Sequence, residues 1–481
     1  MRLRTMTAAA LIAAAVCGIH AKSPKRGVSE NEFQFKAQMA AIAPGVSWYY
    51  NWGPSVGRYL KNETMMEFVP MCWNGDYDAD AIRTYVGEHS EVRYLLGFNE
   101  PNFTKQANMT PQAAAARWEG VRALASELGL GLVAPALNYS PNPPYQDPVK
   151  WMDEFVAIVG PDAFDYTAIH SYGGFGVMKE LAETFHERYG KPVWVTEFCY
   201  WPEEGNPDST VQPEAQTSVM MQSVEWLEKT DWIFRYAWFK AVGESSAVKG
   251  PNFGLLISGH GEDPRELSEQ GMVYEHMWDF DADKYFPTEE WIPASHYISQ
   301  YGALLGSSAD GGAVSEPIEI VRFNGGAWAD YQFDVPRTGE YVLELSVSGQ
   351  GEPVRFDPCM EILASEDDAE AGAVLAEART FALSGSAGTY GTVGFTMNLT
   401  GGRRILRVSD AGPGKPSGIR IEALRLCDAA SVGLTGGECD VPTDVYNAGG
   451  MLIRRGVPAD RAFDGLPAGL YVAGGRKIII N

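Results

Sequence analysis

The sequence is poor in cysteine and in positive charge. Only 6 of its 481 residues are cysteine, and their spacing fits no zinc site. Cys359 can pair with Cys427, or Cys427 with Cys439, and free buried thiols are an equal alternative. Lys and Arg total 38 against 62 Asp and Glu, which gives a net charge of −24. A chain this acidic repels phosphate, so nucleic acid is not an expected partner, and uronic-acid polymers and anionic lipid are disfavoured. A neutral ligand is compatible with this charge.

Several catalytic motifs are also missing. The chain has no P-loop, no G-x-G-x-x-G after a strand, no H-E-x-x-H and no G-x-S-x-G. Their absence argues against a nucleotide enzyme, a zinc protease of that type and an α/β-hydrolase. His170, His260 and His276 are too scattered to indicate a metal site. We therefore expect neither a metal nor an organic cofactor.

Residues 1–21 have the pattern of a secretory signal peptide. Arg2 and Arg4 precede the short apolar run Ala8–Val16, and small residues follow at Gly18–Ala21. Val16 stands where a lipoprotein signal needs a small residue before Cys17, which favours cleavage without a lipid anchor. No later run of about 20 apolar residues follows, so no membrane span is expected. The sequence predicts a secreted or cell-surface protein.

Apolar strand-like runs alternate with helical patterns between about residues 40 and 306. Continuous apolar runs that alternate with amphipathic helices indicate a parallel sheet covered on both faces. Eight such units predict an α/β fold of the (β/α)₈ TIM-barrel type. The expected strands are Gly45–Trp52, Glu67–Trp73, Tyr94–Glu100, Leu130–Asn138, Tyr166–Tyr172, Pro192–Tyr200, Ile233–Lys240 and Phe253–Ile257.

Two glutamates end apolar strands of this predicted barrel. Glu100 ends YLLGFNE and Glu197 ends VWVTE, at the barrel face where active sites are built. Two expected strands lie between them, so the two carboxylates face each other across the mouth. Paired carboxylates are the machinery of glycoside hydrolysis, in which one protonates the leaving oxygen and the other attacks the anomeric carbon. The alternative without catalysis is two unrelated glutamates, each salt-bridged or solvated.

The motifs around these glutamates resemble glycoside hydrolase family 128 over about residues 40–305. They are GFNEPN at 97–102, WVTEF at 194–198, SWYYNW at 47–52, FVPMCW at 68–73, PALN at 135–138 and IHSY at 169–172. The resemblance implies a retaining endo-β-1,3-glucanase with Glu100 as acid/base and Glu197 as nucleophile. The clan of this family carries these residues after strands four and seven, whereas the runs above place them after strands three and six. Either a strand within Glu32–Ala43 has been missed or a later strand is spurious.

Residues beside the glutamates are candidates for binding sugar. The Asn99 amide can bond the sugar 2-hydroxyl, and its alternative is a loop cap. His170 and Tyr172 can orient Glu197 or contact the sugar, although a structural histidine is about as common. The other candidates are Asn138 and six aromatic residues able to stack on a pyranose, about half of which are expected to be core: Trp48, Trp52, Trp73, Tyr139, Trp201 and Trp238. Trp73 and Trp238 are the strongest of these.

The composition changes after residue 306. Short alternating strands with regular turns predict an all-β sandwich over 313–428, and GGAWADYQFDVPRTGEYVLELSV within it resembles family 6 carbohydrate-binding modules. Its loop 410–418 has no aromatic residue, and Trp328 and Tyr331 can be core, so packing or spacing is the favoured role. The short β segment 443–481 resembles the C-terminal sorting segments of secreted Bacteroidetes proteins, or is a hairpin that closes the sandwich.

Together these patterns predict a secreted, monomeric enzyme of a Gram-negative bacterium that acts on a neutral β-glucan. Two alternatives stay open. The same machinery can act on another neutral β-glycan, such as a mannan, xylan or galactan. The chain can also be a glycan-binding surface protein without catalysis, although both glutamates are intact.

Overall fold

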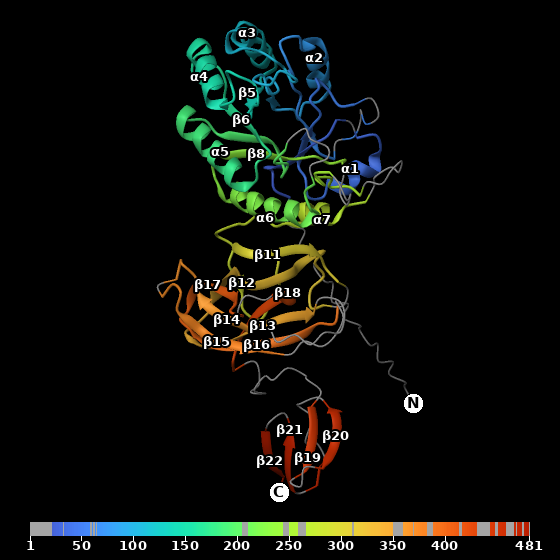
Figure 1. Ribbon diagram of the computed structural model, residues 1–481, viewed down its shortest axis with the longest axis vertical. Helices are drawn as coiled ribbons and strands as arrows, with labels where there is room; N and C mark the ends of the chain where they lie inside the picture. Colours follow the sequence, from blue (N-terminus) through green and yellow to red (C-terminus); the bar gives the residue numbers. More distant parts are fainter. Residues whose placement is uncertain are drawn as a thin grey trace, which may run out of the picture.

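The computed structural model describes residues 22–480 with internal gaps. The gaps are residues 32, 58–59, 61–62, 64, 204–209, 244–249, 258–265, 310–311, 350–358, 369, 382–387, 413–415, 431–442, 448–450, 458–465, 468 and 474–475. Figure 1 shows an α/β barrel, a β domain beneath it and a small C-terminal sheet. The predicted fold class is confirmed.

The barrel wall is an eight-stranded parallel sheet in the order β3-β2-β1-β8-β7-β6-β5-β4. A parallel bridge between Met71 and Leu96 joins the chain after β3 to the chain after β4, so the two ends of the sheet meet. The strands are β1 (Arg26–Ser29), β2 (Trp48–Tyr50), β3 (Glu67–Phe68), β4 (Tyr94–Leu95), β5 (Gly131–Leu137), β6 (Tyr166–Ser171), β7 (Val193–Phe198) and β8 (Ile233–Phe239).

Helices cover the outside of this sheet (Figure 1). They are α1 (Lys36–Ile42), α2 (Ala79–Glu88), α3 (Pro111–Leu128), α4 (Pro148–Val159), α5 (Phe175–Tyr189), α6 (Pro213–Lys229) and α7 (Glu269–His276). Their ends follow local chemistry. The Thr110 and Asp147 side chains accept hydrogen bonds from the first turns of α3 and α4, with proline in the first turn of each. Gly129 and Gly190 end α3 and α5 in the left-handed conformation.

The strand β1 corrects the strand count. It lies upstream of the interval where a missing strand was sought and upstream of the predicted start at residue 40, and it pairs with both β2 and β8. Of the predicted runs, Phe253–Ile257 forms no strand, and each of the other seven contains one. Glu100 therefore follows β4 and Glu197 lies in β7, three strands apart in the sheet.

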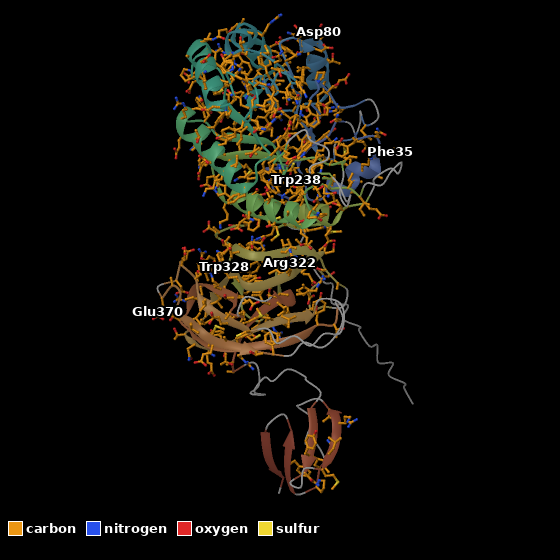
Figure 2. All side chains as sticks on the ribbon, viewed as in Figure 1. Phe35, Asp80, Trp238, Arg322, Trp328 and Glu370 are labelled. Carbon is orange, nitrogen blue, oxygen red and sulfur yellow. The ribbon has the colours of Figure 1, made fainter. Side chains whose placement is uncertain are left out.

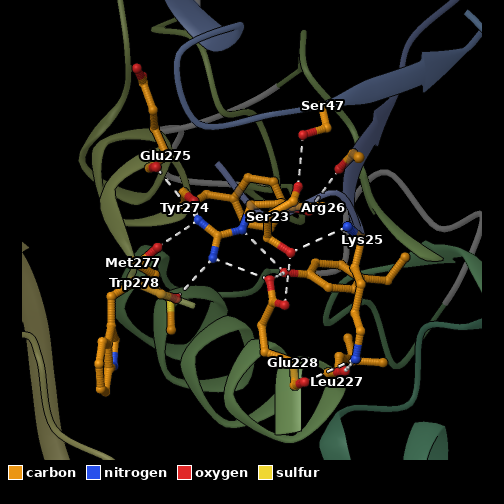
Figure 3. A network of polar contacts seen from close by, with 12 residues as sticks. Ser23, Lys25, Arg26, Ser47, Leu227, Glu228, Tyr274, Glu275, Met277 and Trp278 are labelled. Carbon is orange, nitrogen blue, oxygen red and sulfur yellow. Dashed lines mark hydrogen bonds and ion pairs between the residues drawn. The ribbon is translucent and has the colours of Figure 1, made fainter. Parts of the chain in front are cut away.

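The sequence of β1 gives no strand signal because most of its residues are not apolar. All four of them are nevertheless buried. Figure 3 shows how its arginine is accommodated. The Arg26 guanidinium donates to the carbonyls of Tyr274, Met277 and Trp278 and forms an ion pair with Glu228 at 3.4 Å. A buried charge is tolerated when its donors are all paired in this way.

Glycine is required at position 27, the second residue of β1, for a steric reason. A Cβ at this position would lie 2.2 Å from Cε2 of the Trp48 ring. Only glycine leaves room for the Trp48 indole at this distance from β1.

The β domain is antiparallel, with its central strands in the order β15-β14-β17-β12-β18-β13-β16. These strands are β12 (Ile318–Val335), β13 (Gly339–Gly349), β14 (Cys359–Ala364), β15 (Val374–Thr380), β16 (Gly391–Leu399), β17 (Gly402–Asp410) and β18 (Pro416–Asp428). Burial alternates along β16 and β17, as expected for strands with one face on a core.

The domain boundary near residue 306 was wrong. Three strands upstream of it belong to the β domain: β9 (Phe286–Pro287) and β11 (Ser299–Ser307) pair with β12, and β10 (Ile292–Pro293) pairs with β18. Residues of β11 and β12 also touch the barrel. Arg322 bonds Glu214 of α6 at 2.7 Å, and the Ser299 hydroxyl donates to Glu225 of the same helix at 2.9 Å.

The C-terminal segment forms its own four-stranded sheet in the order β20-β19-β21-β22. The strands are β19 (Thr443–Asn447), β20 (Leu452–Val457), β21 (Gly469–Ala473) and β22 (Arg476–Ile480). It does not extend the β domain sheet.

The structure bears on the predicted cysteine pairs and membrane span but not on every residue involved. Cys359 and Cys427 are not bonded to each other, and Cys439 lies outside the described residues, as does the predicted signal peptide. Within the part of the chain that is described, no helix is long and apolar enough to cross a membrane.

Candidate active site

Glu100 and Glu197 converge at the carboxyl-terminal end of the barrel strands. Glu100 stands four residues beyond the bridge at Leu96, and its backbone N–H donates to the carbonyl of Ala136 in β5 at 2.9 Å. Glu197 is the fifth residue of β7 and is in register with His170 of β6. Their exposed fractions are only 2% and 4%. Both carboxylates are therefore fixed by strand backbone rather than by a mobile loop.

The Glu197 carboxylate is held by three donors. The Tyr50 hydroxyl donates to Oε1 at 2.9 Å, the Trp52 indole N–H donates to the same oxygen at 2.8 Å, and the Tyr172 hydroxyl donates to Oε2. Burial, followed by the neighbouring Glu197 charge, raises the pKa of Tyr50 well above its usual value, so this hydroxyl keeps its proton. Both oxygens of this carboxyl group therefore act as hydrogen-bond acceptors.

The Glu100 carboxyl is in a different setting. Burial raises its pKa above the usual 4.5, and the Glu197 charge adds to this, while hydrogen bonds from His170 and Asn138 act in the opposite direction. Its backbone has a φ of +41°, and Trp52 has a φ of +61°. Bulky residues rarely adopt this left-handed region, and such backbone is found where the surrounding structure enforces it, often at active sites.

His170 lies between the two carboxylates and is fully buried. Its Nδ1 is 2.9 Å from Oε1 of Glu100, and its Nε2 is 3.5 Å from Oε1 of Glu197. One imidazole ring therefore links the two groups, and a change of charge on either carboxylate acts on the ring.

A carboxyl oxygen of each glutamate and a ring nitrogen of His170 lie within 4.8 Å of one another. Such a grouping can in principle hold a divalent ion. Here, however, hydrogen-bond donors occupy both oxygens of Glu197. A metal ligand needs an oxygen with free lone pairs. The contacts of Glu197 therefore fit a carboxyl group that reacts with substrate better than one that binds a metal ion.

A cavity of about 500 Å³ opens over the two glutamates. Its lining mixes amides with aromatic rings, the usual make-up of a site for a polar, neutral ligand. The lining residues are Asn31, Asn51, Trp52, Trp73, Asn99, Glu100, Gln106, Tyr172, Glu197, Trp201 and Phe239.

Most of the residues predicted from sequence meet at this cavity or directly behind it. Asn99, Trp52, Trp73, Tyr172 and Trp201 line it. His170 and Asn138 contact Glu100 from behind the cavity wall.

Asn99 offers one atom to a ligand. Its side-chain N–H donates to Gln106 at 3.4 Å, and its buried Oδ1 has no hydrogen-bond partner among the described residues.

Three predicted sugar platforms are not at the cavity. Trp48 and Trp238 are fully buried in the barrel, where their indole N–H groups donate to the carbonyls of Lys25 and Phe253. Tyr139 is 46% exposed but does not line the cavity. Trp238 points to the helix side of the sheet because side chains alternate along a strand and its neighbour Phe239 faces the cavity. Trp48 lies on the same face as Tyr50, inside the barrel, but nearer the amino-terminal end of β2 and so below the cavity.

Several site residues were missed from the sequence. Tyr50, which bonds Glu197, and Asn51, which lines the cavity, lie within the motif SWYYNW, where the alternation of side chains could have separated Tyr50 from its neighbours. Asn31 follows β1, which was not recognised as a strand. Gln106 and Phe239 have no local signal, because only the closed barrel brings them to the mouth.

Comparisons with known proteins agree with this chemistry. A family model described as "Glycosyl hydrolase catalytic core" matches residues 27–274. Among solved structures, the chain is similar to a family 128 subgroup II endo-β-1,3-glucanase from Pseudomonas viridiflava, with 36% identity, a TM-score of 0.46, and coverage of 53% of this chain and 98% of that one.

Two further structures are similar over the same part of the chain. A subgroup I endo-β-1,3-glucanase from Amycolatopsis mediterranei, solved with laminaritriose, has 25% identity, a TM-score of 0.43 and coverage of 53% and 99%. A subgroup III curdlan-specific exo-β-1,3-glucanase from Blastomyces gilchristii has 27% identity, a TM-score of 0.40 and coverage of 52% and 97%. No curated protein matches the chain.

The family model covers more than half of the chain and begins in β1, the strand that completes the barrel. It also spans both glutamates and every residue that lines the cavity. This chain belongs to the glycosyl hydrolase catalytic core family.

Proposed function

We propose that this protein is a retaining endo-β-1,3-glucanase that acts on a neutral β-glucan. The observation that carries the proposal is the pairing of two buried strand-end carboxyl groups, one that accepts hydrogen bonds from three donors and one with a raised pKa. Retaining glycosidases place their carboxyl groups about 5–5.5 Å apart, and inverting enzymes about 6.5–9.5 Å. The approach within 4.8 Å supports the retaining class.

In the proposed first step, an ionised oxygen of Glu197 attacks the anomeric carbon while Glu100 gives its proton to the glycosidic oxygen. The bond to the leaving sugar breaks and a glycosyl ester on Glu197 forms. In the second step Glu100, now ionised, takes a proton from water, and the resulting hydroxide displaces Glu197 from the anomeric carbon. The two carboxyl groups thus supply acid, base and nucleophile.

The change of charge on Glu197 drives the change of role on Glu100. While Glu197 is ionised, its charge helps to keep the pKa of Glu100 raised. Ester formation removes that charge, so the pKa of Glu100 falls and the carboxylate becomes available as a base. Asn99 Oδ1, buried and without a partner among the described residues, can accept a hydrogen bond from the sugar 2-hydroxyl during both steps.

The substrate class has two supports. The net charge of −24 disfavours anionic polymers. The solved relatives act on β-1,3-glucans, and one of them shares 36% of its residues with this chain. The two modes of attack, endo and exo, both occur among these relatives, and we choose endo on the motif resemblance.

Product analysis on linear β-1,3-glucan tests the proposal. We expect a ladder of oligosaccharides, with the β-anomer as the first product by NMR, and no reducing ends from the Glu197→Gln variant. A single small product would indicate exo attack, and an initial α-anomer would indicate inversion. Cleavage of a mannan, xylan or galactan in a parallel panel would reassign the substrate, and no release from any polymer would leave a binding protein.

We further propose that the protein is secreted through its predicted signal peptide and sorted or anchored by the C-terminal sheet. The supports are the leader pattern at 1–21 and the resemblance of residues 443–481 to sorting segments. Fractionation of cells that express the full chain and a chain ending at residue 430 tests both. The full chain is expected at the cell surface or in the medium, and the shorter one in the periplasm.

A further inference from the structure

Glu30 is a buried carboxylate at the barrel mouth that the proposed reaction does not use. It follows β1 directly, and only 4% of the residue is exposed. Its backbone N–H donates to the Tyr50 carbonyl at 3.1 Å, which continues the pairing of β1 with β2. Burial raises the pKa of this carboxyl group, while the Lys240 charge and hydrogen bonds from the backbone act in the opposite direction. A buried carboxylate needs partners, and those of Glu30 lie on two different segments of the chain.

The Glu30 side chain joins the chain after β1 to the chain after β8. Its Oε1 accepts a hydrogen bond from the backbone N–H of Asn31 at 2.9 Å and lies 3.4 Å from Nζ of Lys240. Its Oε2 accepts from the backbone N–H of Val242 at 2.6 Å. Figure 2 shows Trp238 near the end of β8, the strand that leads to Lys240. We call Glu30, Lys240 and the two backbone N–H groups the Glu30 clamp.

The two segments that the Glu30 clamp joins both contribute to the cavity wall. Asn31 and Phe239 line the cavity over the two glutamates. The Phe239 ring packs edge-on against the rings of Trp52 and Tyr172, with centroids 6.1 and 5.4 Å away. Both of these residues donate a hydrogen bond to the Glu197 carboxyl group. A shift of the clamp therefore reaches the proposed nucleophile through one layer of aromatic rings.

The geometry of the Glu30 clamp requires a carboxylate. Each of the two oxygens accepts from a backbone N–H of a different segment. A glutamine amide has one acceptor oxygen, and its NH₂ group would face the other N–H donor. Aspartate keeps both oxygens but is shorter by one methylene, so we expect it to reach one segment only. Hydrogen bonds to a charged acceptor are also stronger than neutral ones, so the carboxylate holds both segments firmly.

We infer that Glu30 is a positioning residue of the active site, which fixes Asn31 and Phe239 in the cavity wall. The inference rests on the proposed function, since it takes the cavity to be the place where the glucan is cleaved. Glu30 does not line the cavity and acts through its neighbours. Displacement of a site group by about 1 Å can cost about a hundredfold in rate, so loss of the clamp should be visible in the kinetics of a folded variant.

Kinetics on soluble β-1,3-oligosaccharides test the Glu30 clamp. Glu30→Gln is expected to lower kcat/KM about tenfold to a hundredfold relative to the parent, and Glu30→Asp should fall between the two. Glu225→Gln is the matched control. Glu225 pairs with Lys229 at the same distance of 3.4 Å and is also mostly buried, but it lies in α6, where it bonds Ser299 of the β domain. This control should lose stability and keep the kcat/KM of the parent.

A mutant cycle separates positioning from general support of the fold. Glu30→Gln is also made in a chain that already carries Asn31→Ala and Phe239→Ala. If Glu30 acts through these two side chains, its substitution should now change kcat/KM by less than about threefold, because the groups that it positions are gone. A residue that only supports the fold would give the same fold-change in both backgrounds, since its effect does not pass through those side chains.

Amide hydrogen exchange gives a readout that does not depend on activity. In Glu30→Gln the backbone amides of Asn31 and Val242 should exchange faster than in the parent, while those of α6 should not change. If the parent cleaves no β-1,3-oligosaccharide, the proposed function fails, and the exchange rates still decide whether the clamp holds the two segments. The inference itself is overturned by parent-like kcat/KM or exchange in Glu30→Gln, by an equal loss of kcat/KM in Glu225→Gln, by additive effects in the cycle, or by failure of both Glu30 variants to fold.

Discussion

The two ends of the barrel both bury charged groups, but they treat them in opposite ways. At the amino-terminal end, Arg26 and Glu228 are opposite charges, and backbone carbonyls take up the remaining donors of Arg26 (Figure 3). At the carboxyl-terminal end, Glu100 and Glu197 have the same charge and share one histidine. The first arrangement satisfies every partner within the protein, and the second keeps acceptors for a ligand.

This difference shows which end supports the fold and which does chemistry. Paired and fully bonded charges hold elements together, in this case β1, α6 and the end of α7. Two carboxyl groups within 4.8 Å cost stability, and the proposed reaction uses the proton that the raised pKa keeps on Glu100. We therefore expect substitutions at the two ends to separate stability from activity.

The largest effect on activity is expected for Glu197→Gln. The amide keeps the size of the side chain but is a very poor nucleophile, so kcat on a β-1,3-glucan should fall by about 10⁴-fold or more. Its melting temperature should equal or exceed that of the parent because one of two like charges is gone. Addition of azide to Glu197→Ala is expected to restore turnover with an α-glycosyl azide as product. Azide rescue that gives the α-linked product at Glu100→Ala instead would exchange the two roles.

The largest effect on stability is expected for Arg26→Met at the other end. Removal of the guanidinium leaves Glu228 buried without its cation, which costs about 3–5 kcal/mol in systems of this kind. Urea unfolding monitored by fluorescence measures this, and activity per folded molecule should be unchanged. Arg83→Met is the control, since Arg83 pairs with Glu127 at the surface and its loss should barely move the midpoint. A stable Arg26→Met with low activity would contradict the comparison.

An intermediate effect is expected in the pH dependence. The raised pKa of Glu100 means that ionisation is less favourable in the folded state than in the unfolded one. The stability contributed by this residue is therefore present at low pH and declines as pH rises from about 4.5 through the raised folded pKa. Relative to the parent, Glu100→Gln should become progressively more stable over that window. Thermal melts at a series of pH values measure the difference.

Glu100 should also determine part of the pH dependence of activity. The alkaline limb of kcat/KM reports loss of the Glu100 proton, as a macroscopic property of the coupled pair. With an activated leaving group, which needs no acid, Glu100→Gln should lose this limb. An unchanged alkaline limb in Glu100→Gln would mean that another group is the acid.

The smallest effect separates a cavity tryptophan from a core one. Trp73→Ala removes a ring from the cavity lining and should raise KM about tenfold with little change in melting temperature. Trp238→Phe removes a buried indole whose N–H donates to the Phe253 carbonyl. It should lower stability by about 1–3 kcal/mol and leave KM alone. If both variants change the same property, the division between core and cavity is wrong.

Sequence alone predicted the barrel and the glutamate pair because both leave local signals. Long apolar runs mark β5 to β8, and the polar residues that end these runs mark the mouth. It failed at β1, where the burial of Arg26 is possible only because partners from α6 and α7 surround it. It also failed for Trp238, because an aromatic residue near a strand end has the same local pattern on either face of the sheet. It failed for Trp48 because that residue faces the barrel interior below the mouth, and depth within the barrel has no local signal.

The domain boundary failed for a related reason. Pairing partners of β9, β10 and β11 lie in β12 and β18, beyond the predicted boundary. Strand pairing between distant segments is set by the tertiary fold and has no local signature. A cut near residue 310 would therefore leave three strands of the β domain without partners, and a removable β domain has to begin before β9.

The position of β1 also constrains how the barrel folds. It pairs with β8, and Arg26 bonds Tyr236 across 210 residues of chain. Contacts between such distant segments form slowly because a long loop must first be closed. Pairing of β1 on its β8 side therefore requires that β8 has formed. Until then, the sheet around β1 and β2 is incomplete. Refolding of the barrel should be limited by this closing step, so a substitution such as Arg26→Met should slow folding as well as speed unfolding.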